Sequence, residues 1–116
     1  MWQYSQTTGT LTLNGEFQGT GYSGRMEGRN EGTEESTPNV GPIPRGLYSI
    51  APARYSERLG PLVMNLDPIG HDALGRTNFR IHGDNKTHDA SHGCIVLGPA
   101  IRKTIAESGI NKLEVV

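Results

Sequence analysis

The sequence predicts a mostly-β fold with one main helix near the C-terminus, in a single domain that spans residues 1–116. Glycine and proline are abundant, with 16 and 7 in 116 residues, which is typical of short strands joined by tight turns. Only one stretch has helical spacing of its apolar residues. The hydrophobic fraction is 34%, so we expect a thin core that depends on sheet hydrogen bonds and well-formed turns.

The N-terminal third predicts a hairpin followed by an exposed loop. Residues 11–18 alternate apolar and polar side chains around Asn14-Gly15, a pair that accepts the positive φ angles of a tight hairpin turn. Residues 25–39 are polar, rich in glycine and glutamate, and offer almost nothing to bury. We therefore predict a surface loop there.

Four strands are expected in the middle of the chain. The stiff turn 41–46 leads into a strand over 47–50, and a second strand over 61–66 is closed by Asp67-Pro68. Residues 78–82 alternate so that Phe79 and Ile81 face the core, with His82 at the strand end. Residues 93–97 begin as a turn and continue as an apolar strand.

The helix is predicted over residues 99–108 and is followed by a last strand over 112–116. Pro99 suits the first helical turn, and Ile101 and Ile105 are four residues apart, so they share one face. Gly109 is placed to end the helix.

Charge and composition exclude several classes of partner. The net charge is −1, from 11 basic and 12 acidic residues without a basic stripe, so no nucleic-acid partner is expected. No apolar run reaches membrane-spanning length, and residues 1–5 do not resemble a secretory signal, so export would use another route. The single cysteine excludes an intramolecular disulfide, and no cofactor is expected.

The candidate chemistry is carried by Cys94 and His82. A cysteine nucleophile needs a neighbouring imidazole that accepts its proton, and His82 stands twelve positions before Cys94 at the end of the preceding predicted strand. A loop that doubles back brings two such strand ends together. Gly93 permits an unusual backbone angle before the nucleophile and helps to aim backbone N–H groups at an oxyanion.

Several roles around this pair stay open. Either the Ser91 hydroxyl or the Gly83 carbonyl would hold the second ring nitrogen of His82. His92 is a rival base. A lone cysteine is more often buried and inert than catalytic, so spacing alone does not decide the matter.

At this point the sequence resembles a known family. The blocks His82-Gly83 and Ser91-His92-Gly93-Cys94-Ile95 resemble the active-site signature of the L,D-transpeptidase (YkuD-type) catalytic domain. The shorter spacing, and Val96 where that family often has Arg or Asn, are closer to the compact branch of L,D-transpeptidase and carboxypeptidase toxins of type VI secretion systems. Segments 21–24, 41–48 and 75–85 extend this resemblance over almost the whole chain.

The resemblance implies a curved β-sandwich and a substrate, the tetrapeptide stem of peptidoglycan. Cys94 would attack the carbonyl between diaminopimelate and the terminal D-Ala, giving L,D-carboxypeptidase action or D-amino-acid exchange. It also implies a secreted antibacterial toxin that is active in the target periplasm, with a cognate immunity protein. Because the stem carries carboxylates, Arg76 and Arg80 are candidate anchors, and His92 and Tyr22 are further candidates for substrate contact.

Two other functions remain alternatives. The first is a zinc-dependent hydrolase that uses His82, His88 and His92, with Asp84 or Asp89. The second is a non-catalytic module that binds the cell wall or a partner, although the chain has 1 Trp and 4 Tyr and so little aromatic surface for one.

Overall fold

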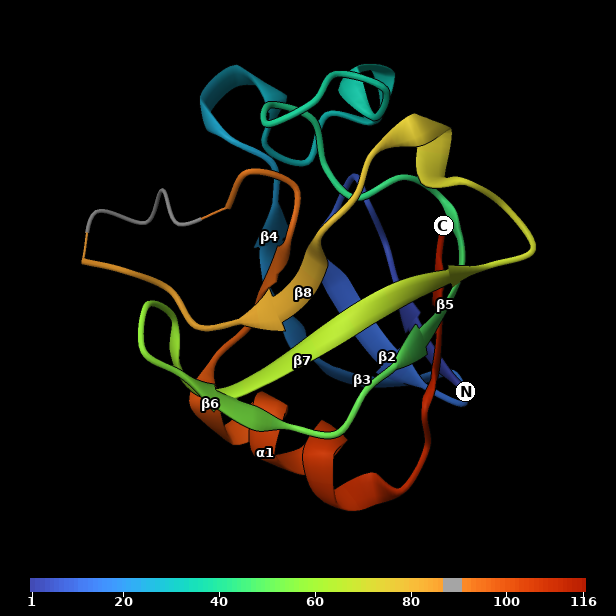
Figure 1. Ribbon diagram of the computed structural model, residues 1–116. Coiled ribbons are helices and arrows are strands. Elements are labelled where there is room, and N and C mark those ends of the chain that lie inside the picture. Colours follow the sequence, from blue (N-terminus) through green and yellow to red (C-terminus); the bar gives the residue numbers. More distant parts are fainter. Residues whose placement is uncertain (87–90) are drawn as a thin grey trace.

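A computed structural model describes residues 1–86 and 91–116 (Figure 1). Their strands form one ten-stranded sheet in the order β3-β2-β1-β10-β5-β7-β8-β9-β4, with β6 attached to β7. The strands are β1 (Trp2–Tyr4), β2 (Thr10–Leu13), β3 (Glu16–Thr20), β4 (Tyr22–Ser23), β5 (Gly46–Ile50), β6 (Arg54–Ser56), β7 (Gly60–Ile69), β8 (Phe79–His82), β9 (Ile95–Val96) and β10 (Lys112–Val115). The helices are α1 (Pro99–Ser108) and the 3-10 turns η1 (Met26–Gly28), η2 (Gly32–Glu34) and η3 (Ala73–Gly75).

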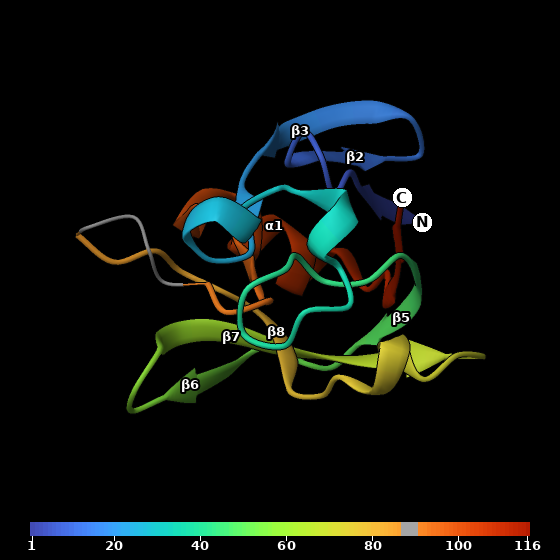
Figure 2. The ribbon, with the colours of Figure 1, turned by 90° about the horizontal axis from the view of Figure 1, so that it is seen from above.

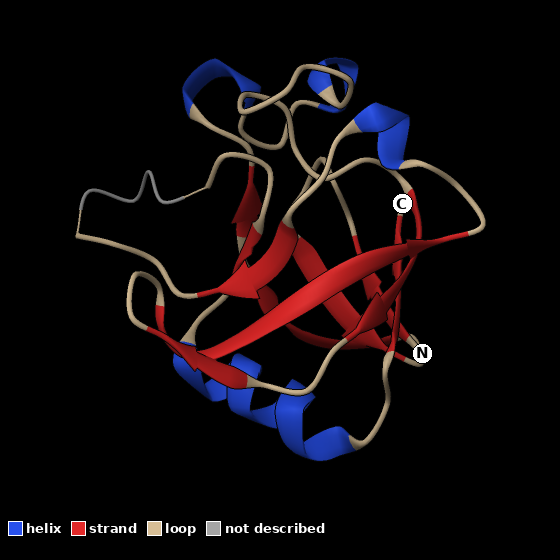
Figure 3. Ribbon diagram, in the orientation of Figure 1, coloured by secondary structure: helices blue, strands red, loops and turns tan. Residues whose placement is uncertain are grey.

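The sheet curves around a single core, and this confirms the mostly-β prediction with one main helix. Figure 2 shows β2 and β3 on one side of the molecule and β7 and β8 on the other, so the two layers of the expected sandwich belong to one continuous sheet. Large side chains with at most 1% exposure fill the space between them: Trp2, Tyr4, Leu11, Tyr48, Ile81, Ile95 and Leu113. Figure 3 shows α1 below the sheet, and this helix contacts β7.

The predicted hairpin and helix are both present. Asn14 and Gly15 have φ angles of 50° and 87°, the left-handed values that a two-residue turn between antiparallel strands requires. Helix α1 spans the predicted residues and ends at Gly109, where φ is 72°. Ile105 is buried on its inner face, as its spacing predicts.

One predicted boundary was wrong, because β7 continues through Asp67-Pro68 to Ile69. A proline is tolerated there because β8 pairs only with Met64–Leu66, so beyond Leu66 the strand has β5 as its only partner in the described residues. The missing N–H of Pro68 therefore removes no bond to a second neighbour.

Three strands were not predicted: β1, β4 and β6. They have two or three residues each, too few for a periodic pattern. Their presence is decided by partners distant in sequence. Strand β1 pairs parallel with β10, with Trp2 opposite Leu113, so the first and last strands of the chain lie side by side, with the two termini at opposite ends of the pair (Figure 1).

None of the helices in the described ranges has the length and apolar character needed to cross a membrane.

Candidate functional site

Strands β8 and β9 place the candidate residues. They pair in parallel, with Ile81 opposite Ile95 and His82 opposite Val96, and both isoleucines point into the core. Side chains alternate along a strand, so Arg80 and His82 turn to the opposite face. Cys94 immediately precedes Ile95 and is therefore level with Arg80.

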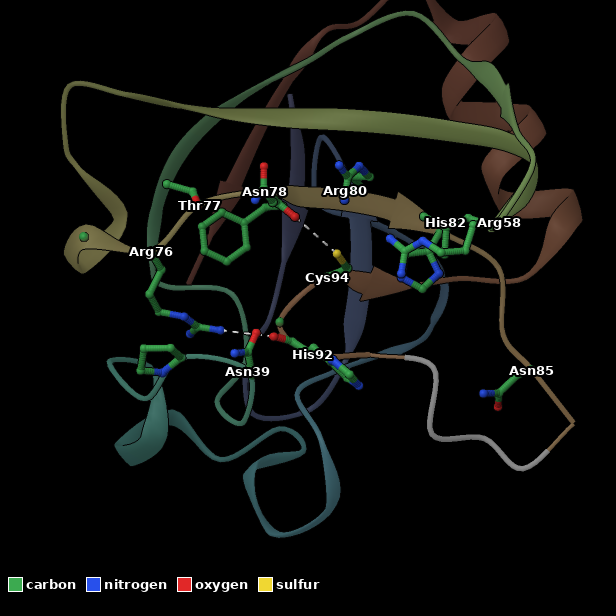
Figure 4. Close-up of a pocket in the computed structure, with 15 residues that line it drawn as sticks. Asn39, Arg58, Arg76, Thr77, Asn78, Arg80, His82, Asn85, His92 and Cys94 are labelled. Carbon is green, nitrogen blue, oxygen red and sulfur yellow. Dashed lines mark hydrogen bonds between the residues drawn. The ribbon is translucent and has the colours of Figure 1, made fainter.

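A groove with a volume of about 700 Å³ opens on this face. Six of the predicted site residues line it: Arg76, Arg80, His82, His92, Gly93 and Cys94. Figure 4 shows the His82 ring and the Cys94 sulfur on the same wall of the groove, along β8. Folding therefore brings the only sulfhydryl and the predicted base to one open surface.

The tautomer of His82 is defined by its surroundings. Its Nδ1 lies 2.8 Å from the carbonyl oxygen of Gly83. Because a carbonyl only accepts hydrogen bonds, Nδ1 must carry the proton, and this leaves the lone pair on Nε2. Burial lowers the pKa of His82, with further lowering by the charges of Arg102, Arg58 and Arg80, although the Gly83 contact opposes them. The imidazole is therefore held neutral, as a base needs.

Cys94 is half-buried, and its thiol donates to the carbonyl oxygen of Asn78 across 3.6 Å. Burial raises the pKa of the Cys94 thiol, while a backbone hydrogen bond from Arg80 and the charges of Arg80, Arg58 and Arg76 act in the opposite direction. Desolvation dominates, so the two shifts favour a protonated thiol at Cys94 and a neutral imidazole at His82. A preformed thiolate–imidazolium pair does not fit these shifts.

Ser91 holds the turn before Cys94, and none of its hydrogen bonds in the described part of the chain goes to His82. Its hydroxyl donates to the carbonyl oxygen of Cys94 at 2.6 Å and accepts from the N–H groups of Gly24 and Gly93, at 2.9 and 3.2 Å. The side chain is completely buried. Of the two candidates for orienting His82, the Gly83 carbonyl therefore takes that position.

Gly93 is required by both its backbone angle and its neighbours. Its φ is 126°, and a Cβ added there would lie 2.4 Å from a guanidinium nitrogen of Arg76. Its N–H donates to Ser91 and its carbonyl accepts from Ser23, so that N–H is not available for an oxyanion. Gly93 therefore shapes the turn before Cys94.

Arg76 lines the groove and joins the segments that form its walls, while its role as a substrate anchor stays a prediction. Its terminal nitrogens donate to four backbone carbonyls, those of Glu35, Gly41, Pro42 and His92. Its guanidinium also lies 5.4 Å from the centre of the Phe79 ring. These contacts leave no terminal N–H for a carboxylate of the substrate.

Tyr22 does not line the groove, and its part in substrate contact stays a prediction. Its hydroxyl donates to Asp84 at 2.6 Å, and the guanidinium of Arg29 lies 4.1 Å above its ring. Because β4 pairs with β9 at Tyr22 and Val96, the ring is directed to the loop after β8. His92 is exposed at the rim and lines the groove.

The zinc ligand set proposed from the sequence is only partly described. His88 and Asp89 lie outside the described residues. Within 1–86 and 91–116, no three His, Cys, Asp or Glu side chains gather in a metal-binding group.

The structure adds groove residues that the sequence did not indicate, chiefly Arg58, Asn39 and Asn78. Arg58 lies in the turn between β6 and β7, and Asn39 is the last residue of the polar loop 25–39. Asn78, the first residue of the predicted strand, lies just before β8 and has a φ of 66°, an uncommon angle that turns its carbonyl toward the thiol. No sequence motif marks the turns that supply Arg58 and Asn39.

Comparison with known proteins gives one match. A family model described as the Tlde1 domain matches residues 18–116, which include every candidate site residue. No curated protein matches the chain with significant similarity.

Proposed function

Because the chain belongs to the Tlde1 domain family, whose members are type VI secretion effectors that act on peptidoglycan, we propose that it is a cysteine enzyme that cleaves the L,D bond of tetrapeptide stems. One observation carries the proposal: the only cysteine of the chain shares an open groove with a histidine whose Nδ1 proton is fixed by a carbonyl.

In the first step Nε2 of His82 accepts the thiol proton as Sγ of Cys94 attacks the carbonyl carbon of the L-centre of diaminopimelate. The tetrahedral intermediate collapses with cleavage of the C–N bond, and the imidazolium returns its proton to the leaving nitrogen. D-Ala departs and a thioester remains on Cys94.

In the second step water loses a proton to His82 and attacks the thioester, and the tripeptide acid leaves as the thiol is restored. A D-amino acid in place of water gives exchange by the same path. We assign the backbone N–H of Cys94 to the oxyanion, since the N–H of Gly93 is already bonded to Ser91.

The shifts of the two pKa values fit a base-assisted attack. A protonated thiol and a neutral imidazole are both ready for proton transfer when the carbonyl arrives, and the resting thiol stays less reactive to other electrophiles. We further propose delivery by a type VI machine into the periplasm of a target cell and protection of the producer by a cognate immunity protein.

The test is incubation of the protein with purified disaccharide-tetrapeptide, followed by mass spectrometry of the products and of the intact protein. We expect loss of one D-Ala, exchange with an added D-amino acid, and a transient acyl adduct on Cys94. Cys94→Ala and His82→Ala should each lower the rate by at least about 10³-fold, whereas His92→Ala should retain most of it.

Two results would count against the proposal. Undiminished release of D-Ala by Cys94→Ala would remove the nucleophile from the mechanism. Loss of activity in chelator, with recovery on added zinc, would favour a metal hydrolase instead.

A further inference from the structure

Arginines are the charged side chains that line the groove in the described part of the chain. Arg58, Arg76 and Arg80 line it together with His82 and His92, and no Asp or Glu of the described residues takes part in the lining. Such a surface attracts the anionic groups of a ligand.

Two of the three arginines are free to bind. Arg76 is bonded to backbone carbonyls, as described above. Neither Arg58 nor Arg80 has a side-chain hydrogen bond or ion pair within residues 1–86 and 91–116, and Nε of Arg80 is buried without a partner. A buried donor without a partner costs free energy, so a ligand that supplies an acceptor relieves that cost.

Both free arginines lie next to the reacting groups. Arg80 is level with Cys94 in the β8–β9 pairing, and Figure 4 shows Arg58 beside the His82 ring. The charges of these two residues act on both the thiol and the imidazole, because each lowers the pKa of Cys94 and of His82.

The position of the cations selects one carboxylate of the stem. In a tetrapeptide, the terminal carboxylate is one residue beyond the attacked carbonyl, and one residue spans at most roughly 3.6 Å. A cation beside the sulfur therefore meets the terminal carboxylate. The side-chain carboxylate of diaminopimelate lies several bonds farther away.

We propose that Arg58 and Arg80 form a subsite for the free terminal carboxylate of the stem and thereby restrict cleavage to stems that end in a D-amino acid. This inference rests on the proposed function. A guanidinium binds a carboxylate through paired, charge-assisted hydrogen bonds, which a neutral terminal amide does not reproduce.

The experiment compares three synthetic stems: the tetrapeptide acid, its C-terminal amide, and an acid with lysine in place of diaminopimelate. We expect kcat/KM to fall about 10- to 100-fold for the amide, because a charge-assisted hydrogen bond is lost. The lysine acid, which lacks only the side-chain carboxylate, should stay within about threefold of the parent.

The variant test uses Arg58→Gln, which alters an exposed turn and leaves the core intact. It should lower kcat/KM for the acid and leave kcat/KM for the amide nearly unchanged, so that the ratio of the two values decreases. Arg80→Lys keeps the charge but loses the paired geometry, and should have a smaller effect of the same kind. Arg54→Gln is the matched control, since Arg54 bonds Asn65 outside the groove and should behave as wild type.

Equal cleavage of acid and amide would overturn the subsite while leaving the L,D-cleavage proposal in place. An unchanged ratio of kcat/KM for acid and amide in Arg58→Gln and Arg80→Lys would also overturn the subsite and leave the L,D-cleavage proposal in place. Strong loss with the lysine acid alone would reassign the arginines to the side-chain carboxylate. If none of the stems released D-Ala, the proposed function itself would fail.

Discussion

Replacement of Ser91 by alanine tests whether this side chain stabilises the turn before Cys94 or orients His82. The substitution removes the acceptor of two backbone N–H groups, those of Gly24 and Gly93, and the donor to the Cys94 carbonyl. All of these contacts surround a completely buried side chain, so water does not easily replace the lost hydroxyl.

Each buried group left without a partner costs about 1–3 kcal/mol, so the two N–H groups together predict about 2–6 kcal/mol of lost stability. Native domains have only about 5–15 kcal/mol, and 1 kcal/mol shifts the melting temperature by roughly 4 °C in a domain of this size. We therefore expect Ser91→Ala to melt about 8–24 °C below the wild type.

The assay combines calorimetry with D-Ala release, measured at a temperature where both proteins are folded. Activity should fall at least about 10-fold, because the carbonyl of Cys94 is no longer fixed, but the acid limb of the pH profile should not move, since Ser91 does not contact His82. Ser108→Ala is the control, because Ser108 also donates to one carbonyl and accepts from one N–H, at the half-buried end of α1. A loss below about 1 kcal/mol with full activity would refute this role for Ser91.

Three further expectations follow from the same site. Because the pKa of His82 is lowered, kcat/KM should remain high down to pH values below 6.5. The stability that the neutral ring contributes is fully present above pH 6.5 and should decline as the pH falls from 6.5 through the pKa of the folded state; His82→Gln should flatten that decline in denaturant titrations. Because burial raises the pKa of Cys94, its alkylation by iodoacetamide should accelerate only at alkaline pH, and fast alkylation at neutral pH would contradict a protonated thiol. Arg76→Lys should destabilise the chain by about 2–4 kcal/mol in urea titrations, since an ammonium cannot reach four carbonyls on three separate segments, and near-wild-type stability would show that those bonds are not needed.

The sequence predicted the elements whose signals are local. Asn14-Gly15 defined the hairpin because those residues accept left-handed angles, and Pro99, Ile105 and Gly109 defined the helix. The alternation of Phe79 and Ile81 placed His82 at the end of a strand. Cys94 and Gly93 were local signals too, because the chain has one cysteine and a glycine precedes it at the start of an apolar run.

What the tertiary structure decided involves residues far apart in the chain. The short strands β1 and β4 exist because distant strands offer them hydrogen bonds, as Trp2 does opposite Leu113. Arg58 reaches the groove only because the β6–β7 turn folds over it.

The roles of Ser91, Gly83 and Arg76 show the same division. The sequence offered Ser91 and Gly83 as partners for His82 and Arg76 as an anchor for a carboxylate, but each has several possible hydrogen-bond partners, and spacing does not choose among them. The choice depends on which carbonyls face the side chain after folding: that of Cys94 for Ser91, and four carbonyls on three separate segments for Arg76. Local sequence patterns thus indicated the candidate residues, and long-range packing determined what each of them contacts.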